Sequence, residues 1–189
     1  MNLSNTMDLT GQILVSMPNM LDERFYKTVI YVCAHSKEGS MGIIINKKID
    51  HDHYPNLLEQ LGIDKTIYEK KIFIRYGGPV ETGRGLVLHT DDVIQEGSLP
   101  IDKGIVLTST AEIFNDIAKG QGPKTSILAI GYAGWEAGQL EHEIKQNSWM
   151  TSPVEANFIF EGKIADKWKK AYKILGVDPN YLSQFSGHA

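Results

Sequence analysis

Apolar residues in this chain occur in short runs, separated by polar stretches that contain glycine, proline, asparagine or serine. Runs rich in β-branched and aromatic residues are typical of strands, and runs that are apolar throughout are typical of strands covered on both faces. The pattern predicts strands over 11–16, 28–34, 41–46, 71–75, 84–89, 104–107, 126–130 and 157–160. We expect the second and third strands to form a central hairpin with a loop of about five residues.

Apolar residues at helical spacing predict helices over 56–61, 110–119 and 164–175, and a fourth helix that starts near Gln139. Ser109 and Glu112 have the S-x-x-E spacing of a capping box, so Ser109 is expected to cap the second helix. Residues after Gly176 are expected to form a tail. Because strands and helices do not alternate as βαβ units require, the pattern favours an α+β fold with a mixed sheet.

The most unusual stretch follows the strand predicted over 126–130. It contains three glycines and two large aromatic residues: Gly131, Tyr132, Gly134, Trp135 and Gly138. We predict a tight glycine turn there, leading into a helix. This turn has two interpretations, a packed structural turn or a loop that contacts a ligand. A nucleotide phosphate site is disfavoured, because the glycine spacing matches no phosphate-binding motif and Glu136 would repel an anion.

The composition is that of a globular protein, with 189 residues of which 42% are apolar and 22% are charged. We expect one domain over 1–189, with loosely attached ends at 1–8 and 178–189. The net charge of −4 argues against nucleic acid as a partner, because nonspecific binding needs a basic stripe. Cys33 is the single cysteine, which excludes an internal disulfide and favours a reducing compartment.

The hydropathy of the chain also bears on where it functions. Its first nine residues lack the basic region and apolar core of a signal peptide. No apolar run approaches the roughly 18 residues that a membrane-spanning helix needs. We therefore expect a cytoplasmic protein without a membrane partner.

Two histidines, His35 and His89, each end a predicted strand. If their strands are neighbours, both side chains could face one cleft, where with Asp91 or Glu136 they could bind a metal ion or transfer protons. The alternative is that both are ordinary polar residues at strand ends. We expect no metal site and no cofactor, because no metal-binding spacing such as His-Glu-x-x-His occurs.

Two other polar groups lie on predicted helices. The Glu-His-Glu run at 141–143 points in directions roughly 100° apart, so its side chains cannot converge on one ion, and a solvated helix face is favoured. Lys163, Lys167 and Lys170 share one face of the last helix. They are interpreted as solvated lysines or, alternatively, as a contact for nucleic acid or an acidic partner.

Many short motifs occur in a recognisable order: 11–15, Met17 with Pro18, Asp22 with Phe25, 31–35, 39–46, 77–80, Leu88 with His89, 131–135, 138–141, Glu143 with Ile144, Asn147, Trp149, Trp168, 175–176 and 187–189. With these motifs the sequence resembles the YqgE/AlgH family of bacterial proteins over essentially its whole length. The resemblance implies a compact α+β fold in which a bifurcated mixed sheet forms a pseudo-barrel with helices packed outside. It implies no catalytic residues, because the family has no agreed mechanism. Members are often labelled transcriptional regulators, but nothing in the charge of this chain supports direct DNA binding.

Three functional hypotheses follow. The first is a cytoplasmic binding or regulatory protein that takes a small molecule or a protein partner in a cleft. Its candidate ligand-binding residues are Asn46, Gly77, Gly78, Pro79, Gly131, Tyr132, Gly134, Trp135, Gly138, Gln139 and Glu141, with His35 and His89 nearby. The second is a hydrolase-type enzyme that uses His35 or His89, and the third is a DNA-contacting regulator that uses the lysine helix. The sequence singles out no particular ligand, partner or oligomeric state.

Overall fold

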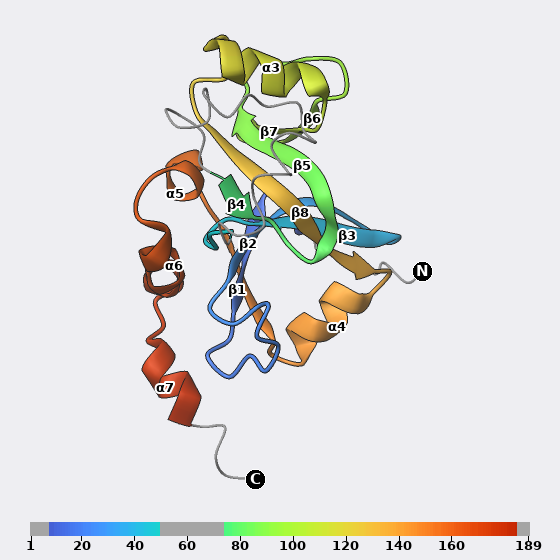
Figure 1. The fold of residues 1–189 in the computed structure, drawn as a ribbon. Helices are drawn as coiled ribbons and strands as arrows, with labels where there is room; N and C mark the ends of the chain where they lie inside the picture. The colour runs from blue at the N-terminus through green and yellow to red at the C-terminus, as the bar shows by residue number, and fades with distance from the viewer. Residues whose placement is uncertain (1–7, 50–73, 185–189) are drawn as a thin grey trace.

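The computed structural model describes residues 8–49 and 74–184, and within them nine strands form one curled sheet (Figure 1). The strands are β1 (Gln12–Ser16), β2 (Val29–Ser36), β3 (Gly39–Ile44), β4 (Ile74–Tyr76), β5 (Val80–Thr90), β6 (Leu99–Asp102), β7 (Ile105–Thr108), β8 (Ser126–Glu136) and β9 (Trp149–Pro153). Their order is β6-β7-β5-β8-β3-β2-β1-β9, all antiparallel, and β4 adds a parallel pairing with β8. The predicted α+β fold with a mixed sheet is therefore confirmed.

Helices cover both faces of the sheet (Figure 1). They are α3 (Ala111–Lys119), α4 (Gln139–Lys145), α5 (Ala156–Phe160), the 3-10 turn η2 (Ile164–Asp166), α6 (Lys167–Leu175) and α7 (Pro179–Gln184). In the described part of the chain, none of these helices has the length and hydropathy that a membrane crossing requires. The predicted helices over 110–119 and 164–175 are confirmed, whereas the one over 56–61 lies outside the described residues.

The buried apolar residues form three hydrophobic clusters, one on one face of the sheet and two on the other. On one face, strands from both ends of the sheet contribute to a single cluster, which α5 and α6 close with Ile159, Trp168 and Tyr172. On the other face the buried residues form two separate clusters, one under α3 and one under α4. A face whose two ends meet in one cluster is concave, so α5 and α6 fill the inside of the curl while α3 and α4 pack outside.

Strand β8 belongs to both halves of the sheet. One of its edges pairs with β5 along most of its length. Its other edge pairs first with β4, over Leu128 to Ile130, and then with β3, over Ala133 to Glu136. The change of neighbour splits the sheet into two branches, which is the bifurcation that the family resemblance implies.

The predicted tight turn over 131–138 is wrong, because β8 continues as a strand to Glu136. Gly131 lies inside the strand with φ 70°, a left-handed conformation that glycine adopts without strain. It acts as a bulge that reverses the alternation of side chains. Ala129 enters the inner cluster before it, whereas Tyr132 packs against that cluster after it and Ala133 enters an outer one.

The central hairpin of β2 and β3 has a shorter loop than the sequence predicts. Lys37 and Glu38 alone connect the strands. The polar residues beside them continue the ladder, since His35 pairs with Ser40. The polar composition of this stretch reflects exposed strand ends rather than a long loop.

Other predicted elements also need correction. The strand predicted over 157–160 lies in helix α5, because a short apolar run does not distinguish strand from helix. Helix α7 occupies part of the predicted tail, and strands β6 and β9 were not expected from their polar and proline-containing sequences. Thr110, not Ser109, caps α3 by accepting a hydrogen bond from the backbone N–H of Ile113, whereas the Ser109 hydroxyl accepts one from Arg84.

Replacing Gly131 with alanine tests the bulge. A Cβ at this position would lie 2.5 Å from the carbonyl oxygen of Gly78, and the left-handed backbone adds its own strain. We expect Gly131→Ala to lower the free energy of unfolding by about 4 kcal/mol, measured by urea denaturation. Gly83→Ala is the matched control, because no atom of the described residues lies within 4 Å of its added Cβ, and it should change stability by less than about 0.5 kcal/mol. Equal effects of the two changes would contradict this account.

Candidate functional site

An open groove of about 720 Å³ lies over the ends of β3 and β8, beside the hairpin loop. Ala34, Met41 and Gly134 form a cross-strand row in it, because the register pairs Met41 with each of the other two. Tyr132 flanks this row, and its ring carbon Cε2 would be 3.4 Å from a Cβ placed on Gly134. The floor of the groove is therefore built from small residues beside one aromatic ring and one flexible thioether.

Four of the predicted candidate residues line this groove: Tyr132, Gly134, Trp135 and Gln139. Gly134 is exposed and Tyr132 is partly exposed, whereas the Trp135 residue retains 7% of its accessible surface. Gly138 has φ 75° and precedes α4 in the left-handed conformation. Its role is to turn the chain from β8 into the helix.

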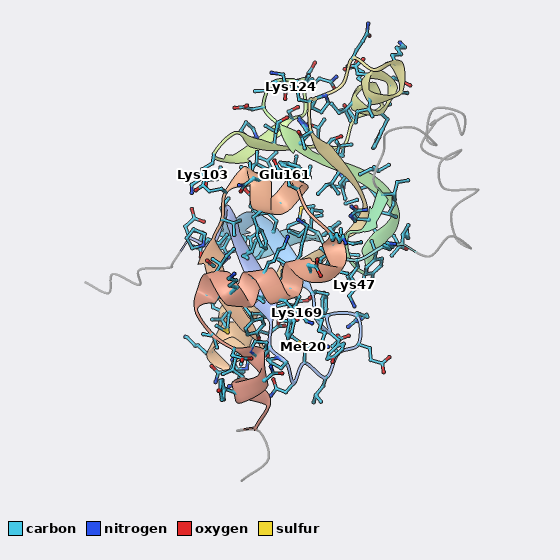
Figure 2. All side chains as sticks on the ribbon, turned by 90° about the vertical axis from the view of Figure 1, so that its left-hand side faces the viewer. Met20, Lys47, Lys103, Lys124, Glu161 and Lys169 are labelled. Atoms are coloured by element: carbon cyan, nitrogen blue, oxygen red, sulfur yellow. The ribbon has the colours of Figure 1, made fainter. Side chains whose placement is uncertain are left out.

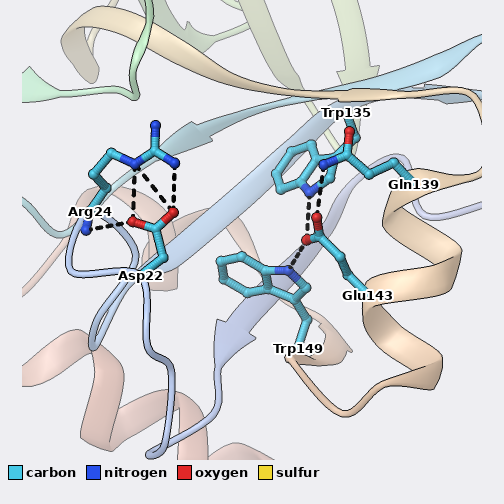
Figure 3. A network of polar contacts seen from close by, with 6 residues as sticks. All are labelled: Asp22, Arg24, Trp135, Gln139, Glu143 and Trp149. Atoms are coloured by element: carbon cyan, nitrogen blue, oxygen red, sulfur yellow. Dashed lines mark hydrogen bonds and ion pairs between the residues drawn. The ribbon is translucent and has the colours of Figure 1, made fainter.

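Behind the groove, one carboxylate holds together the start of α4, the end of β8 and β9 (Figure 3). Glu143 Oε2 accepts hydrogen bonds from the indole N–H groups of Trp135, at 2.9 Å, and Trp149, at 2.7 Å. Its other oxygen accepts a hydrogen bond of 2.8 Å from the Gln139 side chain. The Gln139 oxygen in turn accepts from the backbone N–H of Glu136. Charge-assisted bonds of this kind are stronger than neutral ones, so the four residues form one rigid network.

A row of aromatic rings extends this network towards the loop between β1 and β2. Trp149 packs edge-on against Trp135 and against Phe25, with ring centroids 6.2 Å and 5.6 Å apart. The Arg24 guanidinium lies over the Phe25 ring. It also binds the carboxylate of Asp22 (Figure 3). The hydrogen bonds from Arg24 hold the pKa of the Asp22 carboxyl below its usual value. The loop is thereby fixed to the wall behind the groove.

His35 lies next to the groove with its side chain only 3% exposed. Its Nδ1 is 2.8 Å from the hydroxyl of Ser40, which lines the groove, and its Nε2 is 3.7 Å from a carboxylate oxygen of Glu141. With the ring proton on Nε2, facing Glu141, Nδ1 accepts the hydroxyl proton of Ser40. The candidate residues His35 and Glu141 are thus brought together.

His89 lies elsewhere and has a structural role. Its Nδ1 is 2.8 Å from the carbonyl oxygen of Thr90, so Nδ1 carries the proton and Nε2 accepts from the Thr108 hydroxyl. Burial lowers the pKa of this imidazole, which favours the neutral ring. His89 pairs with Ser126 at the start of β8, whereas His35 lies near Trp135 at its other end, about 30 Å away along the strand. The two histidines therefore do not share a cleft.

The remaining candidates, Asn46 and 77–79, support the fold. The Asn46 side chain accepts a hydrogen bond from the Val29 N–H and donates one to the Lys27 carbonyl, which fixes the start of β2. Gly77 donates its N–H to the Ile130 carbonyl and accepts from the Ile44 N–H, so it joins the two branches of the sheet. Gly78 and Pro79 carry the chain from β4 into β5 across β8.

The lysine helix also differs from the sequence-based interpretation. Lys167 is only 3% exposed and is not a solvated lysine. Its ammonium donates to the carbonyl oxygens of Phe158 and Glu161, at the end of α5, and lies over the Phe158 ring. Burial lowers the pKa of this ammonium to about 8. The face shared by Lys163, Lys167 and Lys170 is therefore not a continuous basic surface.

Comparison with known proteins agrees with the fold and the motifs. The profile described as AlgH-like matches residues 13–180. A UPF0301 protein of Rhodospirillum rubrum is 49% identical over 181 residues, and the match covers 96% of this chain and 94% of the relative's length. The chain belongs to the AlgH-like family.

Solved structures of related proteins show the same architecture. The solution structure of the AlgH protein from Pseudomonas aeruginosa is 34% identical, covers 100% of this chain and 98% of its own, and superposes with a TM-score of 0.79. A crystal structure from Corynebacterium diphtheriae, 20% identical with a TM-score of 0.67, covers 88% of this chain and 86% of its own and shares the fold. The relatives named UPF0301 carry no activity in their names, and the AlgH-like family is functionally uncharacterised.

Sequence reasoning on this AlgH-like chain missed two residues. The sequence pattern places Glu143 on a solvated helix face, although it accepts three hydrogen bonds. The signal that could have found it is its position between two tryptophans whose indole N–H groups need acceptors when buried. The polar composition around Ser40 predicts a loop, whereas Ser40 forms the cross-strand pair with His35.

Replacing Glu143 with glutamine tests the network. The amide keeps the shape of the carboxylate but removes its charge and turns one acceptor into a donor, which then faces an N–H group. We expect Glu143→Gln to lower the free energy of unfolding by about 2 kcal/mol, measured by urea denaturation with far-UV circular dichroism. Glu96→Gln, at an exposed loop position, should have almost no effect. A Glu143→Gln variant as stable as this control would show that the carboxylate is not a stabilising acceptor.

Proposed function

We propose that this AlgH-like protein is a binding protein whose groove over β3 and β8 takes an exposed segment of a partner protein. The observation that supports the proposal is the row of Ala34, Met41 and Gly134 beside Tyr132, an open strip of small and apolar residues on a rigid sheet. Small residues allow close approach of a partner's backbone, and methionine adapts to different partner side chains. The network behind Trp135 keeps this surface preorganised, which lowers the entropic cost of association.

The shape of the groove favours a protein segment over a buried small molecule. Small-molecule sites enclose most of their ligand's surface. Here the lining residues lie on an open sheet face, and Ala34, Ser36, Gly134 and Glu136 are exposed. A partner segment can cover such a surface, and large residues such as tyrosine and methionine are common at the centre of protein interfaces.

The charge of the groove indicates which side chains the partner segment carries. Glu38 and Glu136 line it and are both exposed. Among the lining residues within 8–49 and 74–184 there is no lysine or arginine. A complementary segment therefore carries an apolar side chain for the strip and a lysine or arginine beside it.

A peptide selection tests this function. Random peptides displayed on phage are selected against the native protein, and enriched peptides are titrated while amide chemical shifts are followed by NMR. We expect enriched sequences that combine an apolar residue with lysine or arginine, and shifts at Gly134, Tyr132 and Met41. The double change Glu38→Lys with Glu136→Lys should weaken binding about tenfold or more, because it reverses the charge of the groove.

The matched control is Glu96→Lys with Glu112→Lys, which changes the same net charge at exposed positions outside the groove. It should bind the selected peptides as the native protein does. Shifts confined to another surface, or no enrichment over an unrelated bait, would refute the proposed function.

The contact of Ser40, His35 and Glu141 favours a second candidate function, hydrolysis of an acyl bond. The serine hydroxyl lies within hydrogen-bond distance of one ring nitrogen of the histidine, and the other ring nitrogen faces a carboxylate, which is the order of groups in a nucleophile–base–acid arrangement. Ser40 lines the groove, where an acyl group has access to its hydroxyl. The imidazole would take the serine proton and pass it to the leaving group.

A fluorophosphonate probe, which reacts with activated serines, tests this second function. If Ser40 is activated, the native protein is labelled at Ser40, and both Ser40→Ala and His35→Gln abolish labelling. Ser36→Ala, which removes an exposed hydroxyl from the same groove, should leave labelling unchanged. Absence of labelling in the native protein would reject the hydrolase function and leave the peptide-binding proposal untouched.

A further inference from the structure

A second concavity lies away from the groove, between α6, the start of α7 and the loop that joins β1 to β2. It has a volume of about 810 Å³ and is lined by aromatic rings and lysines, chiefly Tyr26, Lys27, Trp168, Lys169, Tyr172 and Lys173. Figure 2 looks onto α6 and shows Lys169 on the side of the helix nearest the loop that carries Met20. We refer to this concavity as the lysine cleft.

The lysine cleft carries an excess of positive charge. Among the described residues, three lysines line it, Lys27, Lys169 and Lys173, against one carboxylate, Asp178. Across residues 8–49 and 74–184, the ion pairs found involve Arg24, His35, Arg84 and Lys103 but none of these three lysines. Ammonium groups gathered in a concavity without carboxylate partners favour an anionic ligand.

Lys27 is held in place by its own backbone. Its φ of 52° is a conformation that residues other than glycine adopt at a cost, and the Asn46 amide fixes it by donating to the Lys27 carbonyl. The ammonium lies 5.0 Å from the Tyr26 ring centroid and 5.7 Å from that of Trp168. The Lys27 ammonium therefore interacts with two aromatic rings of the cleft. These contacts are weaker than an ion pair, so the ammonium can also bind an anion.

The floor of the cleft is equally fixed. The indole N–H of Trp168 and the hydroxyl of Tyr172 both donate to the carbonyl oxygen of Ser16, at 2.9 Å and 3.1 Å. Their rings pack 4.6 Å apart. Tyr26, in contrast, leaves 43% of its surface exposed. The cleft therefore combines a rigid aromatic floor with one open ring against which a planar group can stack.

We propose that the lysine cleft binds a small phosphate-bearing ligand with a planar ring, of the nucleoside monophosphate class. Two or more ammonium groups match the charge of a phosphate monoester, which is close to −2 at neutral pH. Stacking on Tyr26 matches the ring, and the volume lies within the range of small-molecule sites. This inference does not depend on the proposed function of the groove, because the two concavities share no lining residue.

Titration calorimetry of the full chain tests the proposal with three probes: adenosine monophosphate, inorganic phosphate and adenosine. We expect the monophosphate to bind more tightly than either part alone. Lys169→Gln and Lys173→Gln, at exposed helix positions, should each weaken its binding about tenfold. Tyr26→Ala should weaken the binding of adenosine monophosphate but not that of inorganic phosphate, because it removes the surface on which the adenine ring stacks.

Lys170→Gln is the matched control, since it removes the same charge from α6 but does not line the cleft. It should leave monophosphate binding unchanged. Equal weakening by Lys170→Gln would show a general charge effect and overturn the site. Three other results would overturn it: no binding of the monophosphate at millimolar concentration, tighter binding of duplex DNA through the same lysines, or equal binding of inorganic phosphate and the monophosphate.

Discussion

The contact on which the rest of this structure depends is one between two stretches of backbone with no side chains between them. Gly77 and Gly78 cross β8 at Gly131, so closely that a Cβ on Gly77 would lie 2.2 Å from the Gly131 carbonyl oxygen and one on Gly78 2.1 Å from the Tyr132 carbonyl carbon. At this crossing β8 exchanges β4 for β3 as its neighbour, and Gly77 bonds to both branches. No side chain larger than hydrogen permits that approach, so the sheet can divide there and curl around a single inner core.

The groove follows from the same crossing. Because the Gly131 bulge reverses the alternation of β8, Tyr132 and Gly134 lie on the open face while Ala133 and Trp135 enter the outer core under α4. Trp135 then brings its indole N–H to Glu143, which also receives Trp149. The Glu143 carboxylate thereby satisfies the indole donors of both buried tryptophans. A surface fixed in this way is preorganised, which is what a binding site requires of its scaffold.

The sequence predicts most of this architecture because strands and helices have local signatures. The β-branched runs of β1, β2 and β8 and the apolar stripe of α6 mark their elements without knowledge of the fold. The glycines are different. Their number predicts a tight turn near 131–138, yet their role is set by a partner stretch more than fifty residues away, Gly77 and Gly78, which no local pattern reveals. Glu143 and Ser40 are missed for the same reason: what each contacts depends on the packing of β9 and on the register of the hairpin.

The two concavities have opposite charge, and one strand connects them. β2 starts beside Lys27, which lines the lysine cleft, and ends at Ser36, which lines the groove. Its eight residues span about 26 Å. The first five are buried, and β2 pairs with β1 on one side and with β3 on the other, so close packing opposes a second arrangement of the strand. Coupling between sites needs an element with two discrete states. A strand packed in this way holds its two ends at a fixed separation. We therefore expect the two proposed sites, the groove and the lysine cleft, to act independently, so that binding in one does not change the shape of the other.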